Sequence, residues 1–224
     1  MTTLDATFFG NTHFNADLSN WDTSRVTTLF QTFLGNSNFN ADLSNWDTSS
    51  VTTLSQTFSG DYNFNTDLSN WDTSKVKDLT LTFFDAKNFS GDGLSHWNTS
   101  RLTNLYGTFY GATSFNGDLS DWDTSIVTNM TGTFARASFM GNSLSNWNTS
   151  NVITLYGTFY ATSFTGSSIA NWNISSVTDL SYTFYETSSL FDPENIHGWN
   201  IQSVLTFNKA FSNSNLTDCE KYEL

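Results

Sequence analysis

Acidic side chains recur at one position of a regularly repeated sequence. Asp22, Asp47, Asp72 and Asp123 each follow a tryptophan. Carboxylates stacked about 4.8 Å apart on successive turns of a chain repel by roughly 1 kcal/mol per pair in water. Ca2+ would relieve this repulsion, because it accepts carboxylate oxygens in loose geometry. Calcium binding is therefore one hypothesis for this column of acids.

Asparagine takes the equivalent position in the remaining repeats, at Asn98, Asn148, Asn173 and Asn200. This exchange removes charge from any calcium site. Asp and Asn also cap turns by accepting hydrogen bonds from nearby backbone N–H groups. Turn capping is therefore the favoured interpretation, and calcium remains the alternative.

A second column consists of threonines that share one repeat position. Its members are Thr32, Thr57, Thr82, Thr108, Thr133, Thr158 and Thr183. Facing outward, their methyls and hydroxyls would form a regular rank about 4.8 Å apart, as on several ice-binding solenoids. Facing inward, each hydroxyl would bond a carbonyl one turn back along the chain. Thr32 shares a helical spacing with Leu29 and Phe33, which favours packing and leaves ice binding as the alternative.

Residues typical of enzyme sites do not form a constellation in the sequence. His13, His96 and His197 occupy unrelated repeat positions, and Cys219 is the only cysteine. Paired carboxylates recur from repeat to repeat, whereas an active site is normally singular, and no phosphate-binding glycine motif occurs. We therefore expect no catalytic residue, no metal site of the usual spacing and no cofactor.

The fixed period of the sequence predicts the elements that position these columns. Tryptophans recur every 25 to 27 residues, at Trp21, Trp46, Trp71, Trp97, Trp122, Trp147, Trp172 and Trp199. A period of this length is typical of a solenoid, in which each turn buries its apolar face against its neighbours. We predict a partial N-terminal repeat over residues 1–13, a continuous solenoid of eight repeats over 14–211, and a C-terminal cap or tail over 212–224.

One repeat, residues 14–38, predicts a short parallel strand followed by a short helix or second strand on the opposite side. Trp21 and Thr23 would point inward from the strand, because Ile174 replaces that threonine in a later repeat. Thr27 is a candidate N-cap for the helix. The tryptophans and the phenylalanines equivalent to Phe33 would form two aromatic columns in the core.

The outward side chains of the predicted strand form a polar surface, which we call the strand face. Its residues are Asn20, Asp22, Ser24, Asn45, Asp47, Ser49, Asn70, Asp72, Ser74 and Asp123. A surface repeated along a solenoid favours an extended partner. The strand face is therefore the predicted binding surface.

The charge composition limits the classes of partner that the protein can bind. The net charge is −13, with 8 basic and 21 acidic residues, and no basic stripe is available to replace the counterions of nucleic acid or an anionic membrane. No apolar run is long enough to span a bilayer, and the start does not resemble a signal peptide. Because Met1 begins within a repeat, we interpret the chain as part of a longer protein.

The repeat itself matches a known pattern. The segments FNADLSNWDTS (14–24), FNADLSNWDTS (39–49) and FNTDLSNWDTS (64–74) are nearly identical. The pattern resembles the BspA-type leucine-rich-repeat surface proteins, known from bacteria and widespread in protists and single-celled algae. The resemblance implies a cell-surface or secreted solenoid that recognises a protein or a polysaccharide, without enzymatic activity. The chain departs from the family where Thr32 and its equivalents replace a usual methionine.

Overall fold

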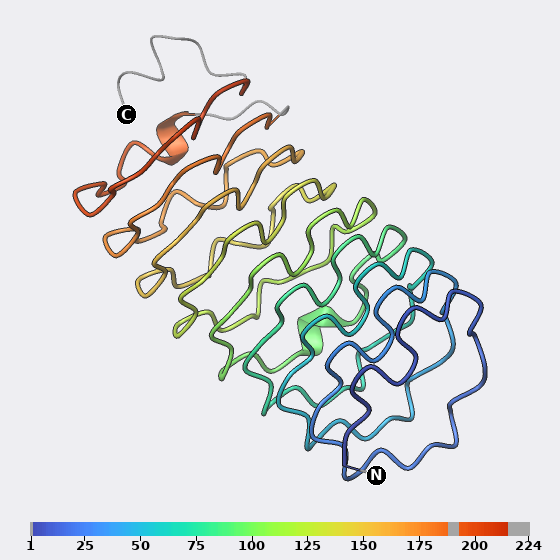
Figure 1. The fold of residues 1–224 in the computed structure, drawn as a ribbon. Helices are drawn as coiled ribbons and strands as arrows, with labels where there is room; N and C mark the ends of the chain where they lie inside the picture. The colour runs from blue at the N-terminus through green and yellow to red at the C-terminus, as the bar shows by residue number, and fades with distance from the viewer. Residues whose placement is uncertain (1, 188–192, 215–224) are drawn as a thin grey trace.

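The protein is an elongated stack of similar turns, here called rungs, which follow one another in chain order from one end of the stack to the other (Figure 1). The computed structural model describes residues 2–187 and 193–214. Each rung corresponds to one sequence repeat, so the predicted repeat architecture is confirmed. Most of the predicted C-terminal cap, from residue 215 onward, lies outside the described residues.

Regular secondary structure is sparse in the described residues. Two 3-10 helices occur there, η1 (Leu94–His96) and η2 (Pro193–Asn195). The β-pairing there consists of isolated parallel bridges, which join Thr53, Asp78, Asn104, Asn129, Thr154, Asp179 and Thr206 in sequence. The predicted strand around Trp21 and the helix predicted after Thr27 are therefore both wrong. The alternative of a second strand after Thr27 is met only by single parallel bridges, such as that between Thr53 and Asp78, and each rung is largely irregular coil.

The segment predicted to be helical is a ribbon of tight turns. The Thr32 N–H donates to the Leu29 carbonyl at 3.1 Å, while the Phe33 N–H donates to the Thr57 carbonyl of the next rung at 3.0 Å. Gln31, between them, has a positive φ of 56°, which an α-helix does not allow. A spacing of three residues fits successive turns as well as one helical face. The sequence pattern was therefore ambiguous, and pairing between rungs decides the conformation.

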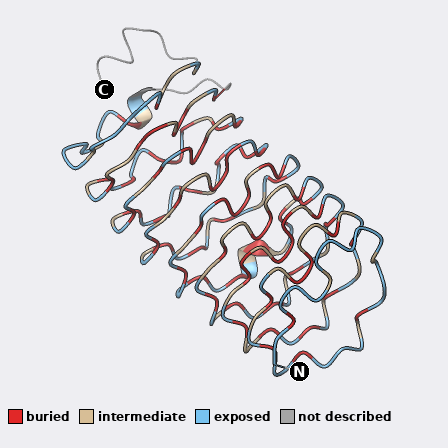
Figure 2. Ribbon diagram, in the orientation of Figure 1, coloured by how far each residue is buried: buried red, intermediate tan, exposed pale blue. Residues whose placement is uncertain are grey.

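Aromatic columns fill the interior as predicted, except at the two ends of the tryptophan column, where Trp21 is 37% exposed and Trp199 is half-buried. The Trp122 and Trp147 rings stack with centroids 6.2 Å apart and an interplanar angle of 4°, and Phe83 and Phe109 stack at 5.7 Å. The tryptophans from Trp46 to Trp172 are at most 4% exposed. Figure 2 shows buried and exposed stretches alternating along the rungs. This burial provides the main drive for stacking.

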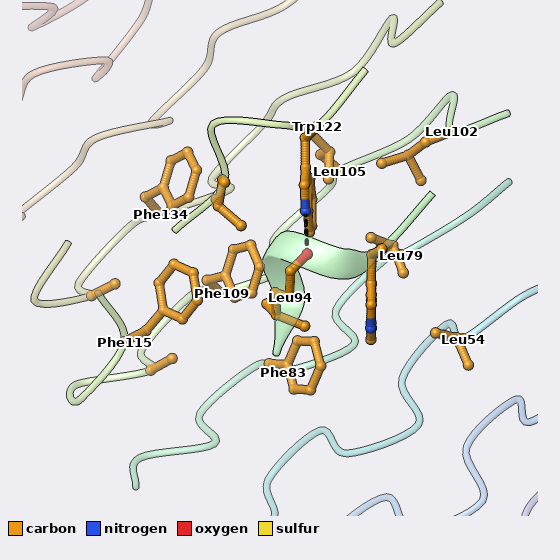
Figure 3. Packing of buried hydrophobic residues seen from close by; sticks show 14 of the residues in the cluster. Leu54, Leu79, Phe83, Leu94, Leu102, Leu105, Phe109, Phe115, Trp122 and Phe134 are labelled. Atoms are coloured by element: carbon orange, nitrogen blue, oxygen red, sulfur yellow. Dashed lines mark hydrogen bonds between the residues drawn. The ribbon is translucent and has the colours of Figure 1, made fainter. Parts of the chain in front are cut away.

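Each buried indole also ties two rungs together. The Trp122 Nε1–H donates to the Leu94 carbonyl of the preceding rung at 2.9 Å (Figure 3). The equivalent bond joins Trp46 to Leu18 at 3.2 Å. A buried indole N–H without an acceptor would be destabilising. The tryptophan is therefore both a packing residue and a link between rungs.

The threonine column lies inside the stack, so its proposed role as an ice-binding surface is wrong. All seven side chains are fully buried: Thr32, Thr57, Thr82, Thr108, Thr133, Thr158 and Thr183. The Thr108 hydroxyl lies 3.0 Å from the Leu105 carbonyl of its own rung and 3.0 Å from the Leu79 carbonyl of the preceding rung. A methionine could not supply this donor. The threonines thus satisfy carbonyl groups of the turn ribbon that are buried in the core.

Candidate functional site: a tyrosine groove

The strand face is exposed or half-buried, as its predicted outward direction requires. Its carboxylates bind their own turns: Asp22 Oδ1 accepts hydrogen bonds from the Ser24 hydroxyl at 2.6 Å and the Ser24 N–H at 3.1 Å. These two bonds lower the pKa of Asp22. The backbone bond recurs between Asp72 and Ser74 at 2.9 Å. The geometry therefore gives these acids a turn-capping role.

A different surface, on the turn ribbon, forms a groove along the stack. Its floor is Gly107, Gly132 and Gly157, one from each of three consecutive rungs, with φ of 57°, 61° and 60°. The ribbon needs a positive φ at this position in every rung, since Gln31 and Leu81 adopt 56° and 51° there. Glycine reaches this conformation without strain. It also leaves no side chain at this position; Gly132 is half-buried, while Gly107 and Gly157 are buried beneath the neighbouring side chains.

Tyrosines form both walls of this groove, which we call the tyrosine groove. Tyr106 and Tyr156 line one side and are 41% and 42% exposed. Tyr110 and Tyr160 line the other and are half-buried. The middle rung carries only small residues, Thr131 and Ala135, beside Gly132. The tyrosine pair of one rung, Tyr106 and Tyr110, is therefore separated from the pair Tyr156 and Tyr160 by one rung of small side chains.

Larger side chains close the groove at both ends. Leu81 and Tyr182 replace the floor glycine at the two ends, and the hollow between them measures about 480 Å³. A Cβ added to Gly107 would lie 2.5 Å from Leu81 Cδ2, so Leu81 leans over the first floor residue. The Tyr182 ring lies 5.4 Å from that of Tyr156. The groove is thus bounded in length.

Two cations lie against the tyrosine rings of the groove: Arg136 at Tyr160, and Lys209, whose Nζ is 5.8 Å from the centre of the Tyr182 ring and 5.6 Å from that of Tyr185. The Arg136 Nη2 donates to the Tyr160 hydroxyl at 3.0 Å, and its guanidinium lies 5.2 Å from the centre of that ring. The bond to Tyr160 raises the pKa of Arg136. No Asp or Glu lines the groove among the described residues. The site can therefore stack flat groups on its rings and donate hydrogen bonds to their edges.

Sequence reasoning missed this groove because it searched for columns present in every repeat. The groove residues are those that vary between repeats. A local signal exists: the segment YGTFY occurs at 106–110 and again at 156–160, with TGTFA at 131–135 between them. Successive repeats alternate between aromatic and small residues on either side of a constant Gly-Thr-Phe, and this alternation indicates where the tyrosines of the groove lie.

In the described ranges, no helix is long and apolar enough to cross a membrane. In the same ranges, no three or more His, Cys, Asp or Glu side chains gather in a way that could hold a metal ion.

Comparisons with known proteins place the chain in a family. The family model described as "Mycoplasma protein of unknown function, DUF285" matches residues 2–104, 78–193 and 153–222. Neither the curated proteins nor the solved structures gave a match. Because the three overlapping matches extend from residue 2 to residue 222, the chain belongs to the DUF285 family.

Proposed function

We propose that this chain is a non-enzymatic recognition solenoid that holds an extended ligand along the tyrosine groove. The observation that carries the proposal is the line of three floor glycines between tyrosine walls, which runs along the stack across consecutive rungs. A linear partner can contact several rungs at once, whereas a compact ligand would contact only one or two.

The groove is formed before any ligand binds. The floor N–H groups already donate to the next rung, from Gly107 to Thr131 at 2.8 Å and from Gly132 to Tyr156 at 2.8 Å. The rings of Phe84 and Tyr110 stack at 5.1 Å. A pre-organised site loses little conformational entropy on binding, which favours affinity.

The chemistry of the lining favours recognition over catalysis. Tyrosine, glycine, threonine and alanine dominate the groove, and its described lining contains no carboxylate, histidine or cysteine. General acid–base or nucleophilic catalysis normally needs such groups. The acids elsewhere are repeated along the stack and cap turns, as Asp22 does.

The proposal extends to the protein as a whole. The BspA-type pattern of residues 14–24 and its copies supports a cell-surface or secreted protein used for adhesion. The net charge of −13 supports a protein or polysaccharide partner and disfavours nucleic acid. The strand face is a weaker candidate surface, because Ser24 and equivalent serines already occupy its carboxylates.

The ice-binding alternative loses the surface on which it depended, since Thr108 and its equivalents are buried. Another threonine column does face solvent, at Thr27, Thr52, Thr103 and Thr128. Its hydroxyls bond the preceding rung, as Thr52 does with the Thr27 carbonyl at 3.1 Å. Lys77 and Ile153 interrupt this column. No observation therefore favours ice over an extended ligand.

The test fills the groove with a side chain that the fold already accepts. Gln56 occupies the floor position of an earlier rung with φ of 56°, so Gly132→Gln should fold and block the groove. A Cβ at Gly132 would lie 3.6 Å from Tyr110 Cδ2, an ordinary contact. Gly60→Gln is the matched control, because Gly60 has φ of 71° and lies outside the groove.

Both variants and the parent would be applied to an array of linear glycans and extended peptides. We expect binding by the parent and by Gly60→Gln, and none by Gly132→Gln. Binding that survives in Gly132→Gln would remove the groove from consideration. Loss of binding after joint replacement of Asp47, Asp72 and Asp123 by Ala would then assign recognition to the strand face.

A further inference from the structure

We propose that the ligand of the tyrosine groove is a neutral, linear chain of pyranose sugars; this inference rests on the proposed function and names its ligand class. The exposed faces of Tyr106 and Tyr156 are the starting point. Pyranose rings present flat C–H faces that stack on aromatic rings, with hydroxyls around their edges. The groove offers a complement to both features.

The spacing of the aromatic clusters suits a repeating ligand. Tyr106 and Tyr110 belong to one rung, and Tyr156 and Tyr160 belong to the second rung after it. Neighbouring rungs repeat at roughly the 4.8 Å of paired strands, and a pyranose unit in an extended chain is close to this in length. One sugar would lie against each tyrosine cluster and one over Gly132 between them.

Hydrogen-bonding groups line the path of such a chain. Among the described residues, the hydroxyls of Tyr106, Tyr110 and Tyr156 have no hydrogen-bond partner, so they are free to bond sugar hydroxyls. Arg136 reaches the Tyr160 hydroxyl from the rim and has further N–H donors. These groups would fix the position of sugars that stacking alone would leave free to slide.

Charge argues for a neutral chain. A cationic ligand would meet Arg136 on the rim beside Tyr160. An anionic polymer would meet a protein of net charge −13, with Arg136 and, at one end of the groove, Lys209 as its nearest counter-charges. A cationic ligand would be repelled by the groove, and an anionic ligand by the protein as a whole. An uncharged glycan would meet neither repulsion.

A proline-rich peptide is the other linear ligand that aromatic grooves accept. Its carbonyl groups need donors at close intervals, since polyproline II rises about 3.1 Å per residue. The floor cannot supply them, because the Gly107 and Gly132 N–H groups are bonded to the next rung. The tyrosine hydroxyls come in pairs, from Tyr106 and Tyr110 and from Tyr156 and Tyr160, and the rung between these pairs supplies none. The sugar chain is therefore the better match to this groove.

Isothermal titration with the whole chain tests the inference. The probes are neutral hexasaccharides with β-1,4 and α-1,4 linkages, an anionic uronic-acid hexamer and a proline-rich decamer. We expect one neutral hexasaccharide to bind, and Tyr156→Ala to weaken it about tenfold, equivalent to ~1.4 kcal/mol. Tyr156→Phe should retain most of the stacking and lose only part of the affinity. Tyr62→Ala is the control, because Tyr62 is 44% exposed and lies outside the groove.

Three results would overturn the inference. Binding of the proline-rich decamer alone, weakened by Tyr156→Ala, would leave the groove as a recognition site and refute the sugar class. Binding of the uronic-acid hexamer in preference to every neutral hexasaccharide would refute the neutral class. A neutral hexasaccharide whose affinity is unchanged in both Tyr156→Ala and Gly132→Gln would show that sugars bind elsewhere, so the groove itself would fail.

Discussion

The rungs that carry the tyrosine groove and the rungs before them share the backbone of the turn ribbon and differ in the side chains at its floor position. Gln31 and Gln56 occupy the floor position in the earlier rungs and bond each other, with Gln31 Nε2 donating to Gln56 Oε1 at 2.8 Å. In the later rungs Gly107 and its successors leave this position empty, with nearly the same φ. The buried residues that recur in every repeat therefore determine the fold. A few exposed positions determine whether a rung also forms part of the groove.

Removing one core tryptophan from each region should cause the largest loss of stability, and comparing the two losses tests whether the regions share one core. Trp122→Ala, below the groove, and Trp71→Ala, in an earlier rung, should each lower the free energy of unfolding by roughly 3–5 kcal/mol. Both rings are at most 3% exposed, and both donate a hydrogen bond to the preceding rung. Urea denaturation measures the loss. Because rungs couple mainly to neighbours, hydrogen exchange should show protection lost around each lesion first.

Trp21→Ala supplies the control, because this end tryptophan is 37% exposed. It should destabilise much less than the two internal variants. Unequal losses for Trp71→Ala and Trp122→Ala, differing by several kcal/mol, would contradict a common core.

The second prediction concerns a buried acid confined to the earlier rungs. Asp61 is fully buried, and neither carboxylate oxygen has a hydrogen-bond partner. Burial raises the pKa of Asp61 from 3.8 to about 9, and the nearby Phe39 backbone N–H acts in the opposite direction with a smaller effect. The folded state therefore holds a proton that the unfolded state releases above pH 3.8. Stability should be unaffected by this group at low pH and should fall as pH rises toward 9.

Asp61→Asn removes this titration. The preceding rung shows that an amide is accepted, since Asn36 is fully buried at the equivalent position and its amide nitrogen can donate to the Phe14 carbonyl at 3.2 Å. We expect a gain on the order of 2–4 kcal/mol at pH 7, shrinking to little near pH 4. Urea midpoints measured from pH 4 to 8 check it. Equal pH profiles for parent and variant would mean that Asp61 is not buried as described.

The third prediction returns to the threonine column. Thr108→Val, below the groove, and Thr57→Val, before it, each remove one buried hydroxyl and keep a branched side chain. Each should destabilise by about 1 kcal/mol, the usual contribution of one hydrogen bond. Thermal or urea unfolding measures it. An unchanged free energy of unfolding in both variants would show that these hydroxyls do not contribute to stability.

The smallest expected effect comes from converting an earlier rung toward the groove. Gln56→Gly relieves the strain of a positive φ but loses the bond with Gln31. These terms oppose each other, so we expect a change in unfolding free energy below about 1 kcal/mol. The variant should gain no sugar binding, because Ser55 and Ser59 stand where Tyr106 and Tyr110 form walls. Sugar binding to the new rung would show that an open floor suffices without tyrosines.

Much of the interior could be predicted from the sequence, because large rings at a fixed period have to be buried somewhere. The inward direction of Trp21 and Thr23 followed from the same periodicity, and Ile174 supported it. The local conformation could not be predicted. The spacing of Leu29, Thr32 and Phe33 fits a helix and a ribbon of turns equally, and only hydrogen bonds to residues 24 positions away, such as that from Phe33 to Thr57, distinguish them.

The candidate site was less predictable than the core. Repetition identified the strand face because its residues recur, yet recurrence here reflects turn capping by Asp22 and Ser24. The groove depends on residues that break the repeat, and on the absence of a side chain at Gly132. A search for regular columns passes over such positions, and only the stacked arrangement brings Tyr106 and Tyr156 to one side.

The tryptophan column should also let electronic excitation energy pass along the stack. From Trp46 to Trp172, adjacent indoles lie 6.2–6.5 Å apart with planes within 4° of parallel. Excitation absorbed by one ring can therefore migrate to its neighbours before it is emitted. Removing the Trp122 ring would leave Trp97 and Trp147 two spacings apart and should slow the migration between the two halves of the column.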